Sequence, residues 1–185
     1  TGKRVLLIDL DLRRRTLTKL MGHRNDRRGV TSYLAGSIEA LKDNITTSEH
    51  SPKLDMMFTG PQPPNPTELL MSKRMEMLIT ELRDKYDYII IDGVPAMAVA
   101  DAMVIDRYVD HAIYVVRQGN LDRRQLPDIE TLYRDKKLHN MSILFNGATI
   151  NKRSYSYGYG YSYYGYDDVP KWKRRWRAFK KLFKK

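Results

Sequence analysis

Two acidic residues follow the first apolar run of the sequence. Residues 5–8 are Val-Leu-Leu-Ile, and Asp9, Leu10 and Asp11 come directly after them. The run is typical of a buried strand. Side chains two residues apart at the end of a strand point to the same face, so the two carboxylates would lie close together. Because a divalent cation such as Mg²⁺ would offset their repulsion, the spacing predicts a cation site there.

A second apolar run ends in the same way. Residues 88–91 are Tyr-Ile-Ile-Ile, and Asp92 follows them. A single Asp in such a place can equally cap a helix or begin a turn. Two strands that both deliver carboxylates favour a ligand site, because α/β folds bind ligands at the carboxyl ends of parallel strands.

Alternating elements must position these carboxylates. We expect strands over residues 4–9, 54–58, 87–92, 111–116 and 142–146, and helices over residues 29–35, 37–42, 67–85, 101–109 and 122–137. Residues 13–15 are expected to lie in a polar connection, with Gly22 and Gly29 as turn signals, and residues 60–66 are too rich in proline for either element. Strands that alternate with helices predict right-handed βαβ crossovers, a parallel sheet and the α/β fold class.

The composition excludes several kinds of site. The 185 residues are 42% hydrophobic, enough for a core, and contain no Cys, which excludes disulfides, thiolate metal sites and Cys nucleophiles. No run reaches the roughly 18–20 apolar residues of a membrane span.

The positive charge is concentrated at the end of the sequence. Nine of the 33 Lys and Arg residues lie in residues 169–185, which contain no acid; 24 basic and 22 acidic residues remain elsewhere. A nearly neutral body argues against nucleic acid as its partner.

The last part of the sequence differs from the rest, and we divide the chain into residues 1–150, 151–168 and 169–185. The middle segment contains seven Tyr among Gly and Ser, and we expect it to be flexible and exposed. The last contains Trp172, Trp176, Phe179 and Phe183 among cations, a pattern typical of a membrane-surface helix. A solvated basic tail and a nucleic-acid contact are the alternatives.

Four motifs in order give the chain a family resemblance. Residues 6–13 (Leu-Leu-Ile-Asp-Leu-Asp-Leu-Arg), the proline-rich residues 60–70, the strand that ends at Asp92 and the tyrosine cluster resemble those of bacterial tyrosine autokinases. These are the cytoplasmic kinase domains attached to polysaccharide co-polymerase membrane proteins of capsule and exopolysaccharide systems. Residues 124–130 and the Gly-Tyr repeats resemble a Bacteroidetes-type member.

The resemblance implies a fold and a reaction. The fold would be a P-loop NTPase-like (deviant Walker), doubly wound, mostly parallel sheet that lacks its first strand, P-loop and helix, with a disordered Tyr-rich tail. The reaction would transfer the γ-phosphoryl group of ATP, with Mg²⁺ as the metal ion, to tyrosine. The phosphate acceptors would be Tyr155, Tyr157, Tyr159, Tyr161, Tyr163, Tyr164 and Tyr166.

The same resemblance suggests roles for individual residues. Asp11 and Asp92 would hold Mg²⁺, and Asp9 would accept the tyrosine proton, although paired carboxylates can share roles. Arg13 would either orient a phosphate or lock the Asp-bearing loop. Asn146 would contact adenine, and its alternative role is a turn residue before Gly147.

The chain departs from the family pattern in two places. The phosphate-binding loop G-x-x-x-x-G-K-[ST] is absent, since Gly2-Lys3 precedes a strand whereas such a loop follows one. Residues 92–95 are Asp-Gly-Val-Pro where the family has Asp-Thr-Pro-Pro. In the family the phosphate-binding loop lies upstream, so we expect these 185 residues not to turn over ATP alone.

The implied partners are neighbouring subunits in a homo-oligomeric ring, a co-polymerase membrane domain, a cytoplasmic tyrosine phosphatase and, through residues 171–185, an anionic membrane surface. The implied location is the cytoplasmic face of the bacterial inner membrane.

Two other functions remain open. One is a deviant-Walker ATPase of the partitioning or cell-division type, with water as acceptor; the other is a non-catalytic module that binds membrane or nucleic acid.

Overall fold

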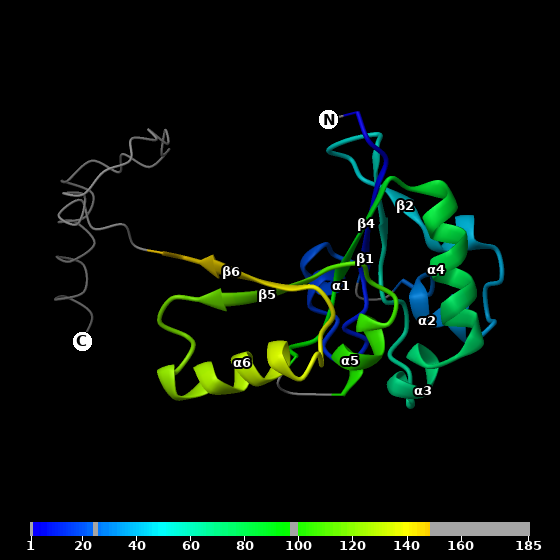
Figure 1. Ribbon diagram of the computed structural model, residues 1–185. Coiled ribbons are helices and arrows are strands. Elements are labelled where there is room, and N and C mark those ends of the chain that lie inside the picture. The colour runs from blue at the N-terminus through cyan, green and yellow to red at the C-terminus, as the bar shows by residue number, and fades with distance from the viewer. Residues whose placement is uncertain (1, 24–25, 97–99, 149–185) are drawn as a thin grey trace, which may run out of the picture. The chain divides into compact units, whose positions relative to one another are not determined.

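Six strands lie in two separate sheets within residues 2–23, 26–96 and 100–148, the residues that this computed structural model describes. They are β1 Val5–Asp9, β2 Thr46–Thr47, β3 Leu54–Met57, β4 Tyr88–Asp92, β5 Ala112–Arg117 and β6 Met141–Asn146. The first sheet has the order β2-β3-β1-β4, and the second pairs β5 with β6 (Figure 1). Every pairing is parallel except that of β2 with β3, so the expected α/β fold is confirmed.

Strand β1 is the centre of the first sheet. It pairs with β3 on one side and with β4 on the other. Leu6 and Ile8, whose side chains point to the same face of the sheet, are completely buried. They belong to one apolar cluster that also includes Leu10, Leu12, Val30, Leu34, Met57, Leu70, Met75, Leu78 and Leu82. The residues on both sides of Asp9 and Asp11 are therefore anchored in the core.

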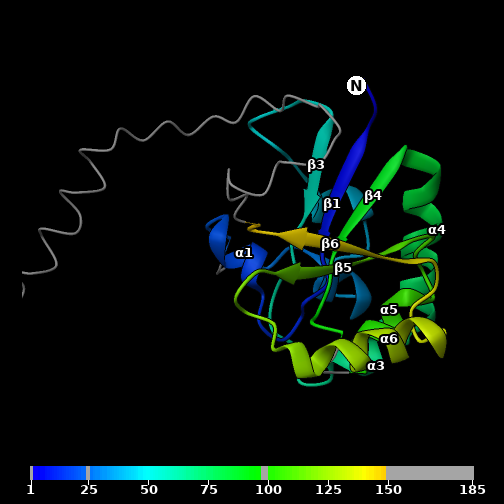
Figure 2. The ribbon, with the colours of Figure 1, turned by 60° about the vertical axis from the view of Figure 1, so that its left-hand side comes forward.

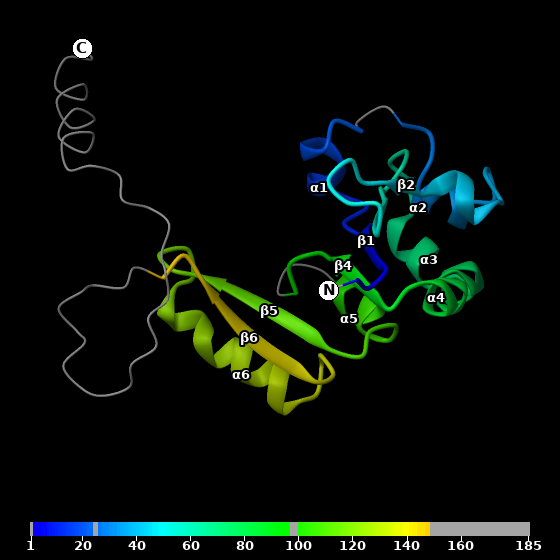
Figure 3. The ribbon, with the colours of Figure 1, turned by 90° about the horizontal axis from the view of Figure 1, so that it is seen from above.

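The helices flank the two sheets. Their bounds are α1 Thr16–Leu20, α2 Val30–Leu34, α3 Pro66–Leu70, α4 Lys73–Lys85, α5 Asp101–Asp106 and α6 Leu126–Arg134, with short 3₁₀ helices at Leu41–Asn44 and Arg123–Gln125. Helices α2 and α4 lie on one side of the first sheet, and α6 lies alongside β5 and β6 (Figure 3). The second sheet runs obliquely across the direction of β1 and β4 (Figure 2).

The expected single helix over residues 67–85 is wrong. The structure has α3 and α4, which Met71 and Ser72 separate. The hydroxyl of Ser72 accepts a hydrogen bond from the amide of Met75 at 3.3 Å and so caps the second helix. A local hydrogen bond here overrides the continuous 3.6-residue pattern.

Other element boundaries also differ from expectation. The helix expected over residues 37–42 is wrong, because only the 3₁₀ turn Leu41–Asn44 forms there. Helix α1 occupies part of the expected polar connection, and the short strand β2 was not expected. Helices α5 and α6 end at Asp106 and Arg134, three residues before the bounds expected from the apolar pattern. Asp122 starts the helical segment as expected, because it caps the 3₁₀ helix Arg123–Gln125, which continues directly into α6.

No helix among the described residues is both long enough and apolar enough to cross a membrane. The tyrosine cluster and the basic segment, residues 151–185, lie outside the described residues. Residues 1, 24–25 and 97–99 lie outside them as well.

Candidate active site

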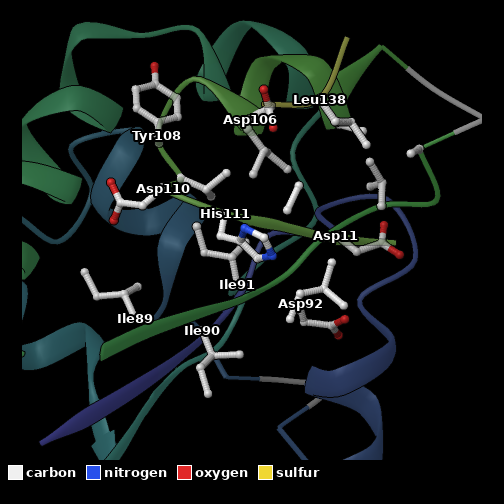
Figure 4. Close-up of a pocket in the computed structure, with 18 of the residues that line it drawn as sticks. Asp11, Ile89, Ile90, Ile91, Asp92, Asp106, Tyr108, Asp110, His111 and Leu138 are labelled. Atoms are coloured by element: carbon white, nitrogen blue, oxygen red, sulfur yellow. The ribbon is translucent and has the colours of Figure 1, made fainter. Parts of the chain in front are cut away.

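The two acidic strand ends lie side by side, as the sequence predicts. Asp9 at the end of β1 is the register partner of Asp92 at the end of β4. The amide of Leu10 donates a hydrogen bond to the carbonyl of Asp92 at 2.9 Å, which joins the two strand ends beyond the last residue of β1. Asp11 and Asp92 both line one cleft, and their carboxylates lie at the same side of it (Figure 4).

Asp9 is fully buried, and its carboxylate is held by the chain itself. Its Oδ2 accepts hydrogen bonds from the amide of Thr18 at 2.9 Å and from the Thr18 hydroxyl at 2.7 Å. Its Oδ1 accepts one from the amide of Asp11 at 3.1 Å. The carboxylate therefore fastens the loop that carries Asp11 to the start of α1.

A second threonine extends this buried network. The hydroxyls of Thr18 and Thr59 are 3.0 Å apart, and the amide of Thr59 donates to the Thr18 hydroxyl at 3.1 Å. The guanidinium of Arg15 donates to the Thr59 hydroxyl at 3.0 Å. The network thus joins the end of β1 to the segment that follows β3. Nothing in the spacing of Thr18 or Thr59 along the sequence pointed to this contact.

Asp11 shapes its own turn and faces the cleft. Its Oδ1 accepts a hydrogen bond from the amide of Arg14 at 3.0 Å, and its carbonyl accepts one from the amide of Arg15 at 2.8 Å. Arg15 has a positive φ of 55°, so the turn reverses sharply before α1 begins. Asp11 is buried, with 6% exposure, and lines the cleft, so the second carboxylate of the motif is fixed in position at the cleft wall.

The electrostatics at Asp92 favour a bound cation. Partial withdrawal from water and the like charges of Asp9 and Asp11 raise the pKa of Asp92. Within the described residues, no group of three or more His, Cys, Asp or Glu side chains could hold a metal ion. Mg²⁺ is commonly held by one or two carboxylates together with water and substrate phosphates, so Asp11 and Asp92 fit that ion.

Arg13 makes a set of contacts with other chain segments. Its Nε donates to Oδ2 of Asp101 at 2.7 Å, and its Nη2 donates to Oδ1 of Asp101 at 3.3 Å and to the Thr67 hydroxyl at 2.9 Å. The Thr67 hydroxyl donates to Asp101 at 2.6 Å. Of the two roles considered for Arg13, these contacts favour locking the Asp-bearing loop. Sequence reasoning expected Thr67 and Asp101 only at helix starts.

The remaining predicted residues are placed elsewhere. Asn146 ends β6 and is exposed; its carbonyl accepts a hydrogen bond from the amide of Gln118 at 3.0 Å, and it is not among the residues that line the cleft. Gly93, Val94 and Pro95 do line the cleft beside Asp92. The seven predicted acceptor tyrosines lie outside the described residues.

Comparison with known proteins supports the interpretation of these motifs. No family model matches the chain. It is 34% identical over 153 residues to the tyrosine-protein kinase YwqD of Bacillus subtilis, which covers 83% of this chain and 63% of YwqD. It is 40% identical over 121 residues to the tyrosine-protein kinase etk of Escherichia coli K12, which covers 64% of this chain and 16% of that protein. The chain thus spans less than two thirds of either relative.

Solved structures give the same result. The VpsO kinase domain superposes with a TM-score of 0.71 at 30% identity and covers 80% of this chain and 72% of that domain. The kinase domain of Escherichia coli ETK superposes with a TM-score of 0.70 at 35% identity, over 87% and 62% of the two chains. The MinD cell division protein of Aquifex aeolicus, at 20% identity and a TM-score of 0.57, shares the fold. The chain therefore belongs to the bacterial tyrosine-protein kinase family.

Proposed function

We propose that this chain forms most of the kinase domain of a protein-tyrosine autokinase. ATP would be the phosphoryl donor, and the acceptors would be Tyr155, Tyr157, Tyr159, Tyr161, Tyr163, Tyr164 and Tyr166, most simply those of a neighbouring subunit in a homo-oligomeric ring. The observation that carries the proposal is that Asp11, just after β1, and Asp92, at the end of β4, line the same cleft, in a chain that also has a tyrosine cluster.

Asp11 and Asp92 are the residues that would hold Mg²⁺ in this proposal. The ion, when bound, neutralises charge on the β- and γ-phosphates. Both carboxylates line the cleft, and partial burial together with the negative charges of Asp9 and Asp11 raises the pKa of Asp92. The chain positions the pair through the β1–β4 pairing and through the turn at Asp11.

Asp9 is the proposed acceptor of the tyrosine proton, and its burial sets a condition on that role. A general base must come within hydrogen-bond reach of the proton that it removes. Asp9 is fully buried and bonded to Thr18, so a tyrosine hydroxyl reaches it only after those contacts open. Asp11 faces the cleft already, and separate Asp9→Asn and Asp11→Asn variants would distinguish the two carboxylates.

The adenine contact at Asn146 is also part of the proposal. Asn146 lies at the carboxyl end of β6, the side of the second sheet where ligands of α/β folds bind. The sequence has no phosphate-binding loop of the G-x-x-x-x-G-K-[ST] type. We therefore expect the 185 residues alone not to turn over ATP.

Phosphorylation of the tail would reverse its charge. Each phosphate adds about −1.5 to −2 charges, so seven would add roughly −10 to −14 beside the nine Lys and Arg of residues 169–185. We expect this change to weaken contacts between subunits and attachment to an anionic membrane. In this way the kinase, together with its co-polymerase membrane domain, would regulate polysaccharide polymerisation and export at the cytoplasmic face of the inner membrane. A tyrosine phosphatase would remove the phosphates and restore the unmodified tail.

Phosphotyrosine mass spectrometry tests the proposal. The chain is extended at its amino end with a phosphate-binding segment of the G-x-x-x-x-G-K-[ST] type and incubated with MgATP, beside a version that carries Asp9→Asn and Asp11→Asn. Phosphate on the tail tyrosines that is lost in the variant supports the kinase. ATP consumption with an unmodified tail supports the ATPase alternative. If no ATP is consumed, the result supports the alternative of a non-catalytic module.

A further inference from the structure

Three consecutive arginines follow Asp11, and they differ in their surroundings. Arg13 pairs with Asp101, and Arg15 donates to a buried threonine hydroxyl. Arg14 donates only its backbone amide, which bonds the Asp11 carboxylate at 3.0 Å. The exposed guanidinium of Arg14 has no ion pair or hydrogen bond within the part of the chain that the structure describes. It can therefore bind a ligand without first leaving a partner.

Arg14 lies in a groove of about 440 Å³, which we call the cationic groove. It is lined by Arg13, Arg14, Thr16, Lys19 and Leu20, and no acidic side chain of the described residues lines it. Lys19 is exposed and, like Arg14, has no ion pair with another described residue. Leu20 is 78% exposed and gives the groove an apolar side. Two unpaired cations beside an apolar side chain suit a ligand that joins an anionic group to an apolar one.

The cationic groove adjoins the cleft of the candidate active site. Arg14 and Thr16 line both of them. Asp11 and Asp92 lie at one side of the cleft (Figure 4), and the hydrogen bond from the Arg14 amide to Asp11 places the start of the Arg14 side chain beside that carboxylate. A polypeptide with one side chain in the cleft can therefore place a neighbouring side chain in the groove.

The spacing of the tyrosines suits two adjoining sites. Tyr155, Tyr157, Tyr159, Tyr161 and Tyr163 alternate with Ser or Gly. Side chains two residues apart in an extended chain point to the same side and lie about 7 Å apart. When one of these tyrosines occupies the cleft, the next one along the sequence can thus lie toward the groove.

We propose that the cationic groove binds a phosphotyrosine of an acceptor tail while the cleft holds a tyrosine two residues away. The phosphate would pair with Arg14 and Lys19, and the aromatic ring would contact Leu20. The inference rests on the proposed kinase function and adds a binding site for the product of that reaction. A tail that carries one phosphate would bind more tightly than an unmodified tail, so its next tyrosine would be modified sooner.

Fluorescence anisotropy on the full chain tests the binding. The probe is a labelled peptide of residues 154–162 with one phosphate on Tyr157, and the same peptide without phosphate is the comparison. We expect the phosphopeptide to bind at least tenfold more tightly, because only it supplies an anionic group. Equal affinity of the two peptides would overturn the proposal.

A pair of double variants with the same change in charge locates the binding. Arg14→Gln/Lys19→Gln removes the two unpaired cations of the groove, whereas Lys73→Gln/Arg123→Gln removes two exposed cations that line neither the groove nor the cleft. We expect the first to weaken phosphopeptide binding at least tenfold and the second to change it less than twofold. Equal effects would indicate general attraction to a basic protein and overturn the proposal. All four side chains are exposed, so both variants should fold, which circular dichroism checks.

Two further measurements separate this site from a nucleotide site and from the kinase reaction. ATP also carries phosphate, and we expect it not to displace the phosphopeptide at equal concentration; displacement would assign the groove to the nucleotide and overturn the proposal. In the chain extended with a phosphate-binding segment, the phosphopeptide should be a substrate with a lower KM than the unmodified peptide. Phosphorylation of both peptides with equal KM would overturn the proposal and leave the kinase function intact. If neither peptide is phosphorylated although the phosphopeptide binds through Arg14 and Lys19, the kinase function fails and the binding site stands.

Discussion

Arg13 and Asp101 form a two-point ion pair that joins the two acidic segments of the candidate site. Nε of Arg13 lies 2.7 Å from Oδ2 of Asp101, and Nη2 lies 3.3 Å from Oδ1. Asp101 begins α5, the first helix after Asp92, whereas Arg13 follows Asp11. Burial tends to raise the pKa of Asp101, but the hydrogen bonds from Arg13 and Thr67 outweigh it and hold that pKa below its usual range. The pair therefore fixes one carboxylate-bearing segment against the other.

Asp101→Asn should lower the free energy of unfolding by about 1–3 kcal/mol, the cost of losing charged hydrogen bonds at a buried group. Asp101 is almost completely buried, but the side chain of Arg13 is 44% exposed and can be solvated, which keeps the loss below that of a fully buried pair. Urea unfolding measures the change. Asp110→Asn is the control, because the ion pair of Asp110 with Arg83 at 2.9 Å is exposed and should contribute less than about 0.5 kcal/mol. We call the contacts among Arg13, Thr67 and Asp101 the clamp. Equal losses of unfolding free energy in both variants would show that the clamp does not stabilise the fold.

Thr18→Val should also lower the free energy of unfolding, by about 1–3 kcal/mol. The substitution keeps the shape but removes the hydroxyl that donates to the buried carboxylate of Asp9 and accepts from the amide of Thr59. Thr80→Val is the matched control, since the Thr80 hydroxyl bonds only the carbonyl of Glu76 on an exposed helix face; it should change stability by less than about 0.5 kcal/mol. If Thr18→Val behaved like the control, the Asp9 network would not stabilise the loop.

Asp26 should make stability depend on pH in the acid range. Hydrogen bonds from the Arg28 side chain lower the pKa of Asp26 to about 2. A carboxyl group whose pKa is lowered on folding stabilises the native state above its unfolded pKa of about 3.9, and the contribution is lost as the pH falls through the folded pKa. Because the Arg28 side chain is 54% exposed, the contribution should stay below about 1 kcal/mol. Asp26→Asn should therefore cost stability at pH 6, and the difference should disappear near pH 2. A constant difference across urea titrations at several pH values would contradict this assignment.

Mg²⁺ should stabilise the native chain through Asp11 and Asp92. A ligand at ten times its dissociation constant adds about 1.4 kcal/mol to the free energy of unfolding. Without Mg²⁺, Asp92→Asn should be more stable than the native sequence at neutral pH, because it removes repulsion from Asp9 and Asp11. With Mg²⁺, the variant should show little further gain. Thermal unfolding with and without the ion measures both effects, and Asp110→Asn should respond to Mg²⁺ as the native sequence does. A response of Asp92→Asn equal to that control would place the ion elsewhere.

Sequence reasoning found the elements that have a strong periodic signal. Strands β1, β4 and β5 are near-continuous apolar runs, and the parallel arrangement that follows from them brought Asp9 and Asp92 together as predicted. The site contacts that were missed depend on tertiary structure. Thr18, Thr59 and Asp101 lie far from their partners in sequence, and a lone Thr or Asp carries no periodic signal of such a contact. The break between α3 and α4 was missed because the Ser72 cap interrupts a pattern that remains helical on both sides.

The contacts among Arg13, Thr67 and Asp101 also bear on the order of folding. They join residues that are 54, 34 and 88 positions apart in the sequence. Three segments must be in place before all of these contacts can form, and contacts between distant segments are costly to form early. The clamp should therefore form after the folding transition state, so that losing it accelerates unfolding and leaves the folding rate almost unchanged. The contacts of Arg13 with Thr67 and Asp101, which align the acidic segments, would then control how long the folded chain persists rather than how quickly it folds.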